Sequence, residues 1–179
     1  MEITSSSPYP YYLLSSFSDH PFELDGVRIR SMESFLQALK FTNSDSQKGI
    51  CMMSGLEAKL AGEEKREWTS HLELWWNGRP YRRFNAEYNS LLDRAYWTMM
   101  QANPGFKSAL LATGAEVLTQ SGGPRYRTRS TMTRAEFTRS LTRLRETLKP
   151  DLLNQDIQAT ISVEKSLGSI FRPGRRISP

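Results

Sequence analysis

The chain has very few residues that form disulfides or bind transition metals. Among its 179 residues there is one cysteine, Cys51, and two histidines, His20 and His71, which are far apart in the sequence. A single cysteine excludes an intramolecular disulfide and a cysteine cluster. Two isolated histidines argue against a protein zinc site. The sequence therefore predicts no metal site, and we expect no cofactor.

Long apolar runs are also missing. No stretch approaches the about 20 apolar residues that a membrane helix needs, and residues 1–8 lack the basic start and apolar core of a signal peptide. These features predict a soluble cytoplasmic protein that has no membrane partner. The oligomeric state has no signature in the sequence.

The composition is that of a globular protein. With 38% hydrophobic and 11% aromatic residues, a chain of this length can bury one substantial core. We expect an α+β fold that is predominantly helical, a single domain with two short β-hairpins. The expected boundaries are a flexible N-terminal arm at 1–10, a domain at 11–150 and a C-terminal extension with a mobile basic tail at 151–179.

Two turn signals set the positions of the hairpins. Asp25-Gly26 divides the alternating apolar residues of 21–30, and Asn77-Gly78 divides those of 72–84. The longest helical pattern covers 85–102, where apolar residues recur at helical spacing.

The most informative stretch is 31–41, which has no Gly or Pro and begins with a serine suited to cap a helix. It is predicted to be one continuous helix ending near residue 42 or 43. Beside its apolar stripe, Glu33, Gln37 and Lys40 fall on one face at spacings of four and three. By spacing alone, this is either an exposed polar stripe or a set of reactive groups facing a pocket.

The string S-M-E-S-F-L-Q-A-L-K-F in this stretch resembles the central signature of the NADAR or YbiA-like N-glycosidases. Three further segments resemble that family's motifs in the same order. They are Leu14 to Phe17 with Pro21 to Gly26, Ala58-Lys59 with Gly62 and Trp68, and Leu110 to Gly114. Ser16 stands where the family usually has Asn, and the tryptophan-glycine segment usual after the last motif is missing.

The resemblance implies hydrolysis of an N-glycosidic bond at a ribose anomeric carbon. It implies Lys40 as the nucleophile, Glu33 as the acid and base, and Gln37 as an orienting or structural residue. Ser16 and Phe17 would bind substrate, and Trp68 would either stack on a flat base or belong to the core. The implied substrate is ADP-ribose on guanine of nucleic acid or nucleotides; phosphorylated intermediates of riboflavin synthesis are a second enzymatic alternative.

Positive charge is concentrated near the end of the domain. Residues 123–149 hold eight basic and two acidic side chains, a local excess of +6 in a chain of net charge +5. Arg125, Arg127 and Arg129 are predicted to contact phosphates of a nucleic acid or a phosphorylated nucleotide-like small molecule. The alternative to an enzyme is a catalytically silent module that binds nucleic acid or blocks a partner. For an enzyme, Glu33 and Lys40 should line an open cleft.

Overall fold

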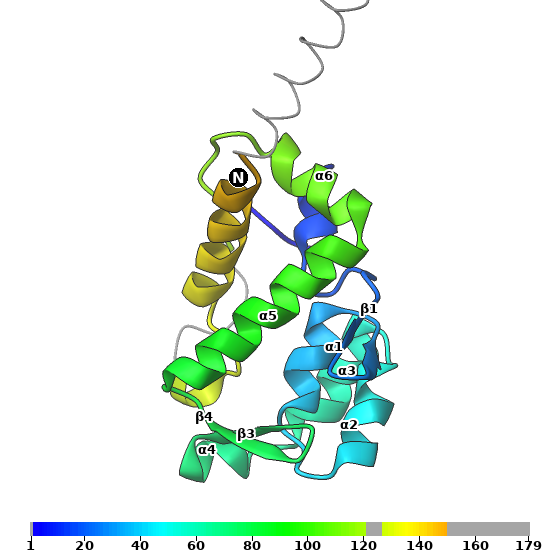
Figure 1. The fold of residues 1–179 in the computed structure, drawn as a ribbon, viewed down its shortest axis with the longest axis vertical. Coiled ribbons are helices and arrows are strands. Elements are labelled where there is room, and N and C mark those ends of the chain that lie inside the picture. The colour runs from blue at the N-terminus through cyan, green and yellow to red at the C-terminus, as the bar shows by residue number, and fades with distance from the viewer. Residues whose placement is uncertain (1, 121–126, 150–179) are drawn as a thin grey trace, which may run out of the picture. The chain divides into compact units, whose positions relative to one another are not determined.

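The computed structural model describes residues 2–120 and 127–149, and the statements below concern those residues. The chain divides into two compact units, residues 1–143 and 144–179. The candidate site lies within the first unit. The predicted fold class is confirmed, because the described chain is mainly helical and has two small antiparallel hairpins (Figure 1).

Both hairpins form at the predicted turns. In the first, β1 (Phe22–Leu24) pairs with β2 (Val27–Ile29), and Asp25 and Gly26 adopt positive φ angles of 51° and 78°. In the second, β3 (Glu73–Trp76) pairs with β4 (Arg79–Arg82), and Asn77-Gly78 makes the same kind of turn. The alternation is as expected, since one face of each hairpin is buried.

The signature helix α1 (Met32–Ala38) begins where predicted but is shorter than the expected 31–41. Ser31 caps it through the backbone amide of Ser34. Its end has a tertiary cause, because the carbonyl of Leu39 accepts a hydrogen bond from the Trp75 amide of β3 at 2.8 Å. The chain after Ala38 therefore turns away, and Lys40 lies beyond the helix.

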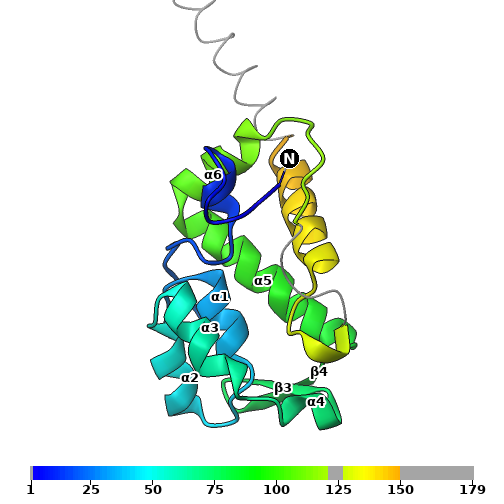
Figure 2. The ribbon, with the colours of Figure 1, turned by 180° about the vertical axis from the view of Figure 1, so that it is seen from behind.

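Three helices follow α1. They are α2 (Ser44–Cys51), α3 (Gly55–Glu63) and the short α4 (Trp68–His71). A capping box opens α3, in which the Ser54 amide donates to the Glu57 carboxylate and the Glu57 amide donates to Ser54 Oγ. Both α2 and α3 pack on α1, and Figure 2 shows the three helices grouped together.

The helix α5 (Ala86–Ala102) confirms the longest predicted helix and contacts α1, β1 and α6 (Pro104–Ala112). Every residue of its predicted apolar stripe is buried. These are Tyr88, Leu91, Leu92, Ala95, Tyr96, Met99 and Met100. The 3₁₀ turns η1 (Tyr11–Leu14) and η2 (Arg127–Arg129) and a helix over 134–149 complete the described elements.

The N-terminal segment makes definite contacts. Ile3 is 1% exposed, and its amide donates to the carbonyl of Thr119 at 2.8 Å. An isolated parallel bridge joins Glu2 to Thr119. The mobility expected for 1–10 stays a prediction, and the extension at 151–179 lies outside the described residues. Within the described ranges, no helix is both long and apolar enough to cross a bilayer.

Candidate functional site

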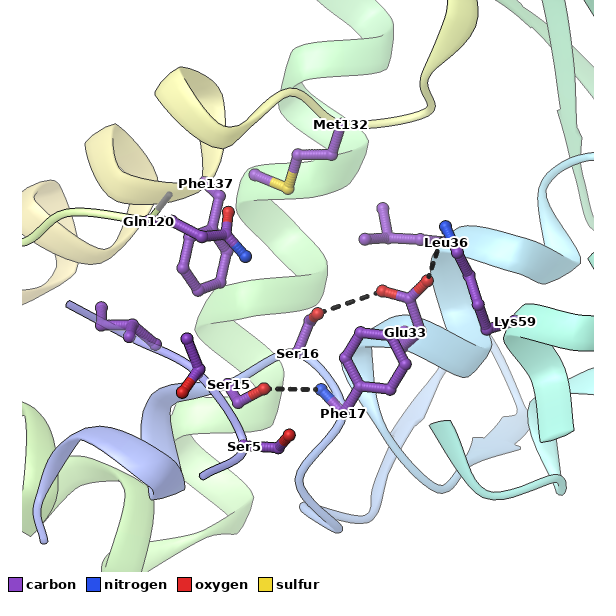
Figure 3. A pocket seen from close by; sticks show the side chains of 12 residues that line it. Ser5, Ser15, Ser16, Phe17, Glu33, Leu36, Lys59, Gln120, Met132 and Phe137 are labelled. Carbon is purple, nitrogen blue, oxygen red and sulfur yellow. Dashed lines mark hydrogen bonds and ion pairs between the residues drawn. The ribbon is translucent and has the colours of Figure 1, made fainter. Parts of the chain in front are cut away.

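A pocket of about 290 Å³ opens beside the first turn of α1 (Figure 3). Its wall combines segments that are distant in the sequence: the N-terminal segment, the loop after η1, α1, α3 and residues near 120 and 132–137. The lining residues are Ile3, Thr4, Ser5, Ser15, Ser16, Phe17, Glu33, Leu36, Lys59, Gln120, Met132 and Phe137. Five of these residues are apolar and seven are polar or charged, so the wall offers both apolar surface and several groups that can orient a small ligand.

Glu33 is the carboxylate of this pocket, and two hydrogen bonds fix it. Its Oε2 accepts from Ser16 Oγ at 3.0 Å, and its Oε1 accepts from Gln37 Nε2 at 2.7 Å. The Glu33 amide also donates to the Ser16 carbonyl at 2.8 Å. Ser16, in the place where the resembled family usually has Asn, therefore acts as a donor to the carboxylate. Glu33 is only 7% exposed, so its orientation is well defined.

Gln37 supports Glu33 from behind. It is 2% exposed and is not among the described lining residues of the pocket. A Cβ added at Gly62 would lie 2.0 Å from Gln37 Oε1, so the backbone of α3 lies directly against this amide. The spacing of four between Glu33 and Gln37 therefore produces a direct contact, as a helix predicts. This contact suits the structural alternative for Gln37.

Lys59 of α3 is the basic residue among the described residues that line the pocket. Its Nζ lies 3.8 Å from Glu33 Oε1, and its side chain is 37% exposed. Figure 3 shows the lysine and the carboxylate on one side of the pocket, with Met132 and Phe137 across from them. An ammonium at this distance from a carboxylate attracts it electrostatically without forming a hydrogen bond.

Lys40 occupies a different position from the one its spacing suggested. It is not among the described lining residues, and its Nζ donates to the carbonyl of Gly62 at 2.9 Å. Burial lowers the pKa of Lys40 to about 8, and the positive charge of Lys59 acts in the same direction. A larger fraction of this amine is therefore neutral near pH 8 than for an ordinary lysine. Of the two residues expected to line a cleft, Glu33 does so and Lys40 does not.

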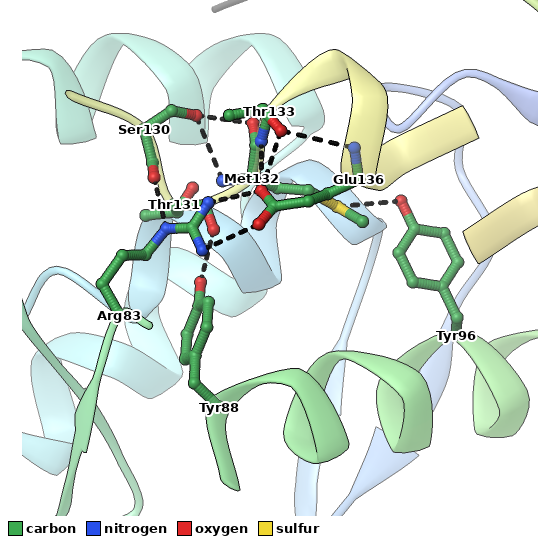
Figure 4. Close-up of polar contacts among 8 residues, drawn as sticks. All are labelled: Arg83, Tyr88, Tyr96, Ser130, Thr131, Met132, Thr133 and Glu136. Carbon is green, nitrogen blue, oxygen red and sulfur yellow. Dashed lines mark hydrogen bonds and ion pairs between the residues drawn. The ribbon is translucent and has the colours of Figure 1, made fainter. Parts of the chain in front are cut away.

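A second carboxylate, that of Glu136, is paired with the guanidinium of Arg83 (Figure 4). Arg83 follows β4 and is completely buried; its guanidinium donates to both carboxylate oxygens of Glu136 and, at 2.7 Å, to the Ser130 carbonyl. The Thr133 amide also donates to Glu136 at 2.9 Å, and the Glu136 amide donates to Thr133 Oγ1 at 3.3 Å, so the two residues form a capping box. We call the Arg83–Glu136 pair the clamp. It fixes the turn that presents Met132 and Phe137 to the pocket.

The clamp has the electrostatics of a structural ion pair. Burial by itself would raise the pKa of Glu136, but hydrogen bonds from Arg83 and Thr133 outweigh it and lower the pKa to about 2. Tyr88 of α5 adds a hydrogen bond of 2.6 Å to the Thr131 carbonyl. Nearby, Tyr96 donates to Met132 Sδ at 3.6 Å. Together these contacts connect α5 to the pocket wall.

The other predicted binding residues separate into two groups. Phe17 lines the pocket together with Ser16. Trp68 is 7% exposed and lies in α4, outside the pocket lining, as its core alternative predicts. Arg125 lies outside the described residues. Arg127 and Arg129 delimit η2, and Arg129 is exposed but is not a described lining residue.

Sequence reasoning missed nine of the twelve described lining residues, among them Lys59, Met132 and Phe137. Lys59 had a usable signal, because Ala58-Lys59 belongs to one of the segments that resemble the family's motifs. Met132 and Phe137 had none as pocket residues, since their position depends on the clamp between β4 and the helix over 134–149. The arrangement as a whole offers one oriented carboxylate, one ammonium at the wall, and a lysine of lowered pKa behind it.

A solved structure supports the fold. The NMR structure of the E. coli protein YbiA matches with a TM-score of 0.59 and 19% sequence identity, and the match covers 86% of each chain. The described fold is therefore YbiA-like, as the signature in 31–41 predicted.

A relative is found in a bacteriophage. The chain is 34% identical over 149 residues to an uncharacterized 17.1 kDa protein from the Gp30–rIII intergenic region of Enterobacteria phage T4. This match covers 83% of the chain and 98% of the phage protein. In addition, residues 8–146 match the family described as bacteriophage protein GP30.3. The chain therefore belongs to the bacteriophage GP30.3 protein family.

Proposed function

We propose that the protein is an N-glycosidase of the NADAR type that hydrolyses the bond between a ribose anomeric carbon and a base nitrogen. The proposed substrate is ADP-ribose attached to guanine of nucleic acid or of a nucleotide. The observation that carries the proposal is the Glu33 carboxylate, which is oriented by Ser16 and Gln37 on the wall of a pocket of about 290 Å³. The motif match in 31–41 and the YbiA-like fold support the same activity.

The proposed reaction begins with attack of a neutral amine on the anomeric carbon. Lys40 is the proposed nucleophile, and its pKa of about 8 provides a useful neutral fraction near physiological pH. The Glu33 carboxylate takes a proton from the attacking amine and passes it to the leaving base nitrogen as the carbon–nitrogen bond breaks. The remaining N–H proton then moves to the ring oxygen as the ring carbon–oxygen bond breaks, which opens the sugar to an imine with the lysine. Glu33 then accepts a proton from the water that adds to the imine, and the lysine is released.

Reaching the sugar requires a movement of Lys40. Its amine donates to the Gly62 carbonyl at 2.9 Å, so it must exchange this bond for the substrate. The lysine side chain has four rotatable bonds, which makes such an exchange compatible with a fixed backbone. Glu33 needs no comparable movement because it already lines the pocket. We further propose that the protein acts in the cytoplasm.

The test is a panel of substrates with product masses as the readout. The protein is incubated with ADP-ribosylated guanine in DNA, RNA and nucleosides, and separately with phosphorylated intermediates of riboflavin synthesis. Release of ADP-ribose and an intact base supports the main proposal. Cleavage of the riboflavin intermediates alone would make those intermediates the substrate of the N-glycosidase. Glu33→Gln should lose the activity, and Glu23→Gln, at an exposed position of β1, serves as the matched control. Absence of any N-glycoside cleavage contradicts the proposal.

The second candidate is a binding module for nucleic acid, favoured by the position of Lys40 outside the pocket lining and by the basic excess of 123–149. A binder of this kind should lose affinity as salt rises, because the release of counterions from the nucleic acid is less favourable into a more concentrated salt solution. Replacing Arg127 and Arg129 by Glu should weaken binding. The slope of log K against log salt should also become less steep, by the contribution of about two phosphate contacts. An unchanged affinity and slope would indicate that these arginines form only a solvated face.

A further inference from the structure

The position of Lys59 follows from the small residues of its helix. In α3, Gly55, Ala58 and Gly62 are buried. A Cβ at Gly55 would lie 2.8 Å from the Cα of Phe17, and a Cβ at Gly62 would contact Gln37. The helix thus packs closely on α1 and on the loop that carries Ser16. This close packing brings Lys59 to the wall beside Glu33.

Lys59 lies among charges of both signs. From α1, Glu33 faces it at 3.8 Å. The charged groups acting on Lys40 are Lys59 and Glu63 of α3, Glu33 of α1, and Arg66 after α3. The Lys40 Nζ donates to the carbonyl of Gly62 at 2.9 Å, and Gly62 follows Lys59 by three residues in α3, so the two amines approach the same stretch of this helix. The positive charge of Lys59 therefore opposes a positive charge on Lys40. The two lysines are therefore electrostatically coupled, although only Lys59 lines the pocket.

We propose that Lys59 is a positioning residue of this site, whose ammonium pairs with the Glu33 carboxylate and repels a second positive charge on Lys40. The inference rests on the proposed function for its catalytic meaning, but the coupling between the two lysines is a property of the resting protein. The pKa of Lys40 is lowered to about 8, so this amine loses its proton at a lower pH than an ordinary lysine. A neighbouring cation is a known means of activating a lysine nucleophile.

The coupling can be measured without any substrate. The full chain is labelled with trace acetic anhydride over a series of pH values, and acetylation of Lys40 is quantified by peptide mass spectrometry. Only neutral amines react, so the midpoint of labelling reports the titration of Lys40. The wild-type midpoint should be near pH 8. Lys59→Met should move it upward by about one pH unit, and Lys59→Arg should leave it in place.

Several outcomes overturn the proposal. An unchanged midpoint in Lys59→Met, at equal thermal stability, shows that Lys59 does not influence Lys40. An equal shift in Lys59→Arg shows that shape, and not charge, is responsible. Should Lys59→Met fail to fold, Lys59→Gln is measured instead, since the side chain is 37% exposed and tolerates polar replacements. Failure of the N-glycosidase proposal leaves this labelling result intact, so the two failures are distinguishable.

Discussion

Two carboxylates of this protein each have a basic partner, and the two pairs are built differently. In the clamp, the Arg83 side chain is 0% exposed and binds both oxygens of Glu136. At the pocket, the Lys59 side chain is 37% exposed and its Nζ stays 3.8 Å from Glu33. The clamp has little freedom and no access to a ligand. The pocket pair has a fixed carboxylate and an adaptable cation, which is the arrangement that chemistry on a bound molecule requires.

The difference also separates stability from activity. Removing one member of a buried ion pair costs about 3–5 kcal/mol, whereas an exposed pair contributes about 0–1 kcal/mol. Loss of the clamp should therefore unfold the wall of the pocket. Loss of the pocket pair should leave the fold nearly unchanged and alter its chemistry.

The largest expected effect is on turnover. Glu33→Gln keeps the size of the side chain but removes the proton carrier, so the rate of N-glycoside cleavage should fall by about 10²–10⁴-fold. The free energy of unfolding should change by less than about 2 kcal/mol, because the amide oxygen still accepts a hydrogen bond. Turnover is measured by product mass and stability by urea unfolding. If the variant is both unstable and inactive, the lost activity follows from unfolding, and Glu33 has a structural role like that of the clamp.

The next effect is on stability. Arg83→Met leaves the Glu136 carboxylate buried without its main partner, and we expect a loss of about 3–5 kcal/mol in the free energy of unfolding. Arg82→Met, at the neighbouring exposed position of β4, is the control and should change little. Urea unfolding at neutral pH measures both. Equal stabilities of the two variants would show that the clamp does not hold the fold.

The clamp should also produce a dependence of stability on acid. The pKa of Glu136 falls from the ordinary 4.5 to about 2 in the folded protein. The ionised Glu136 therefore contributes its full stabilisation of the folded state above the pKa of the unfolded state. This contribution to the free energy of unfolding, about 3 kcal/mol, is lost as the pH drops from about 4.5 to about 2. Comparing urea unfolding of the wild type and Glu136→Gln across this range measures it. A difference between the two proteins that is constant over this range would contradict the assignment, and Glu87→Gln on the exposed start of α5 is the control.

The smallest effect sharpens the description of the pocket pair. Ser16→Ala removes the hydroxyl that donates to Glu33 Oε2 at 3.0 Å and should cost about 1–2 kcal/mol of stability. Turnover should fall more than this loss explains, because the carboxylate is then less well oriented. Ser90→Ala, exposed on α5, is the control. Full activity in Ser16→Ala would show that Gln37 alone is sufficient to orient Glu33.

The predictable part of this fold has local causes. Asp25-Gly26 and Asn77-Gly78 adopt positive φ, which few other residue pairs allow, so the hairpins follow from the sequence. The end of α1 does not follow from the sequence, because residues 39–42 contain no Gly or Pro that would break a helix. The carbonyls of Leu39 and Phe41 instead bind the Trp75 amide and the Gln47 side chain, and such distant partners leave no local pattern.

The same reasoning applies to the site. Glu33 and Gln37 lie within α1, so their spacing correctly predicted a contact. Lys40 lies beyond the early end of the helix, and the face that it was expected to share with Glu33 is interrupted there. Lys59 reached the pocket through the packing of α3 on α1, which depends on Gly55 and Gly62 and on the partner surface. Residues within one helix were thus predictable, and residues placed by packing between helices were not.

Trapping with borohydride tests the central claim most directly, because it reduces an imine between enzyme and sugar to a stable amine. The wild type is treated during turnover of an ADP-ribosylated guanine substrate, and the modified peptide is identified by mass spectrometry. The account predicts a single adduct on Lys40, absent in Lys40→Ala and retained in Lys48→Ala, an exposed lysine of α2. Turnover without any adduct, or an adduct on Lys59 in place of Lys40, would contradict it.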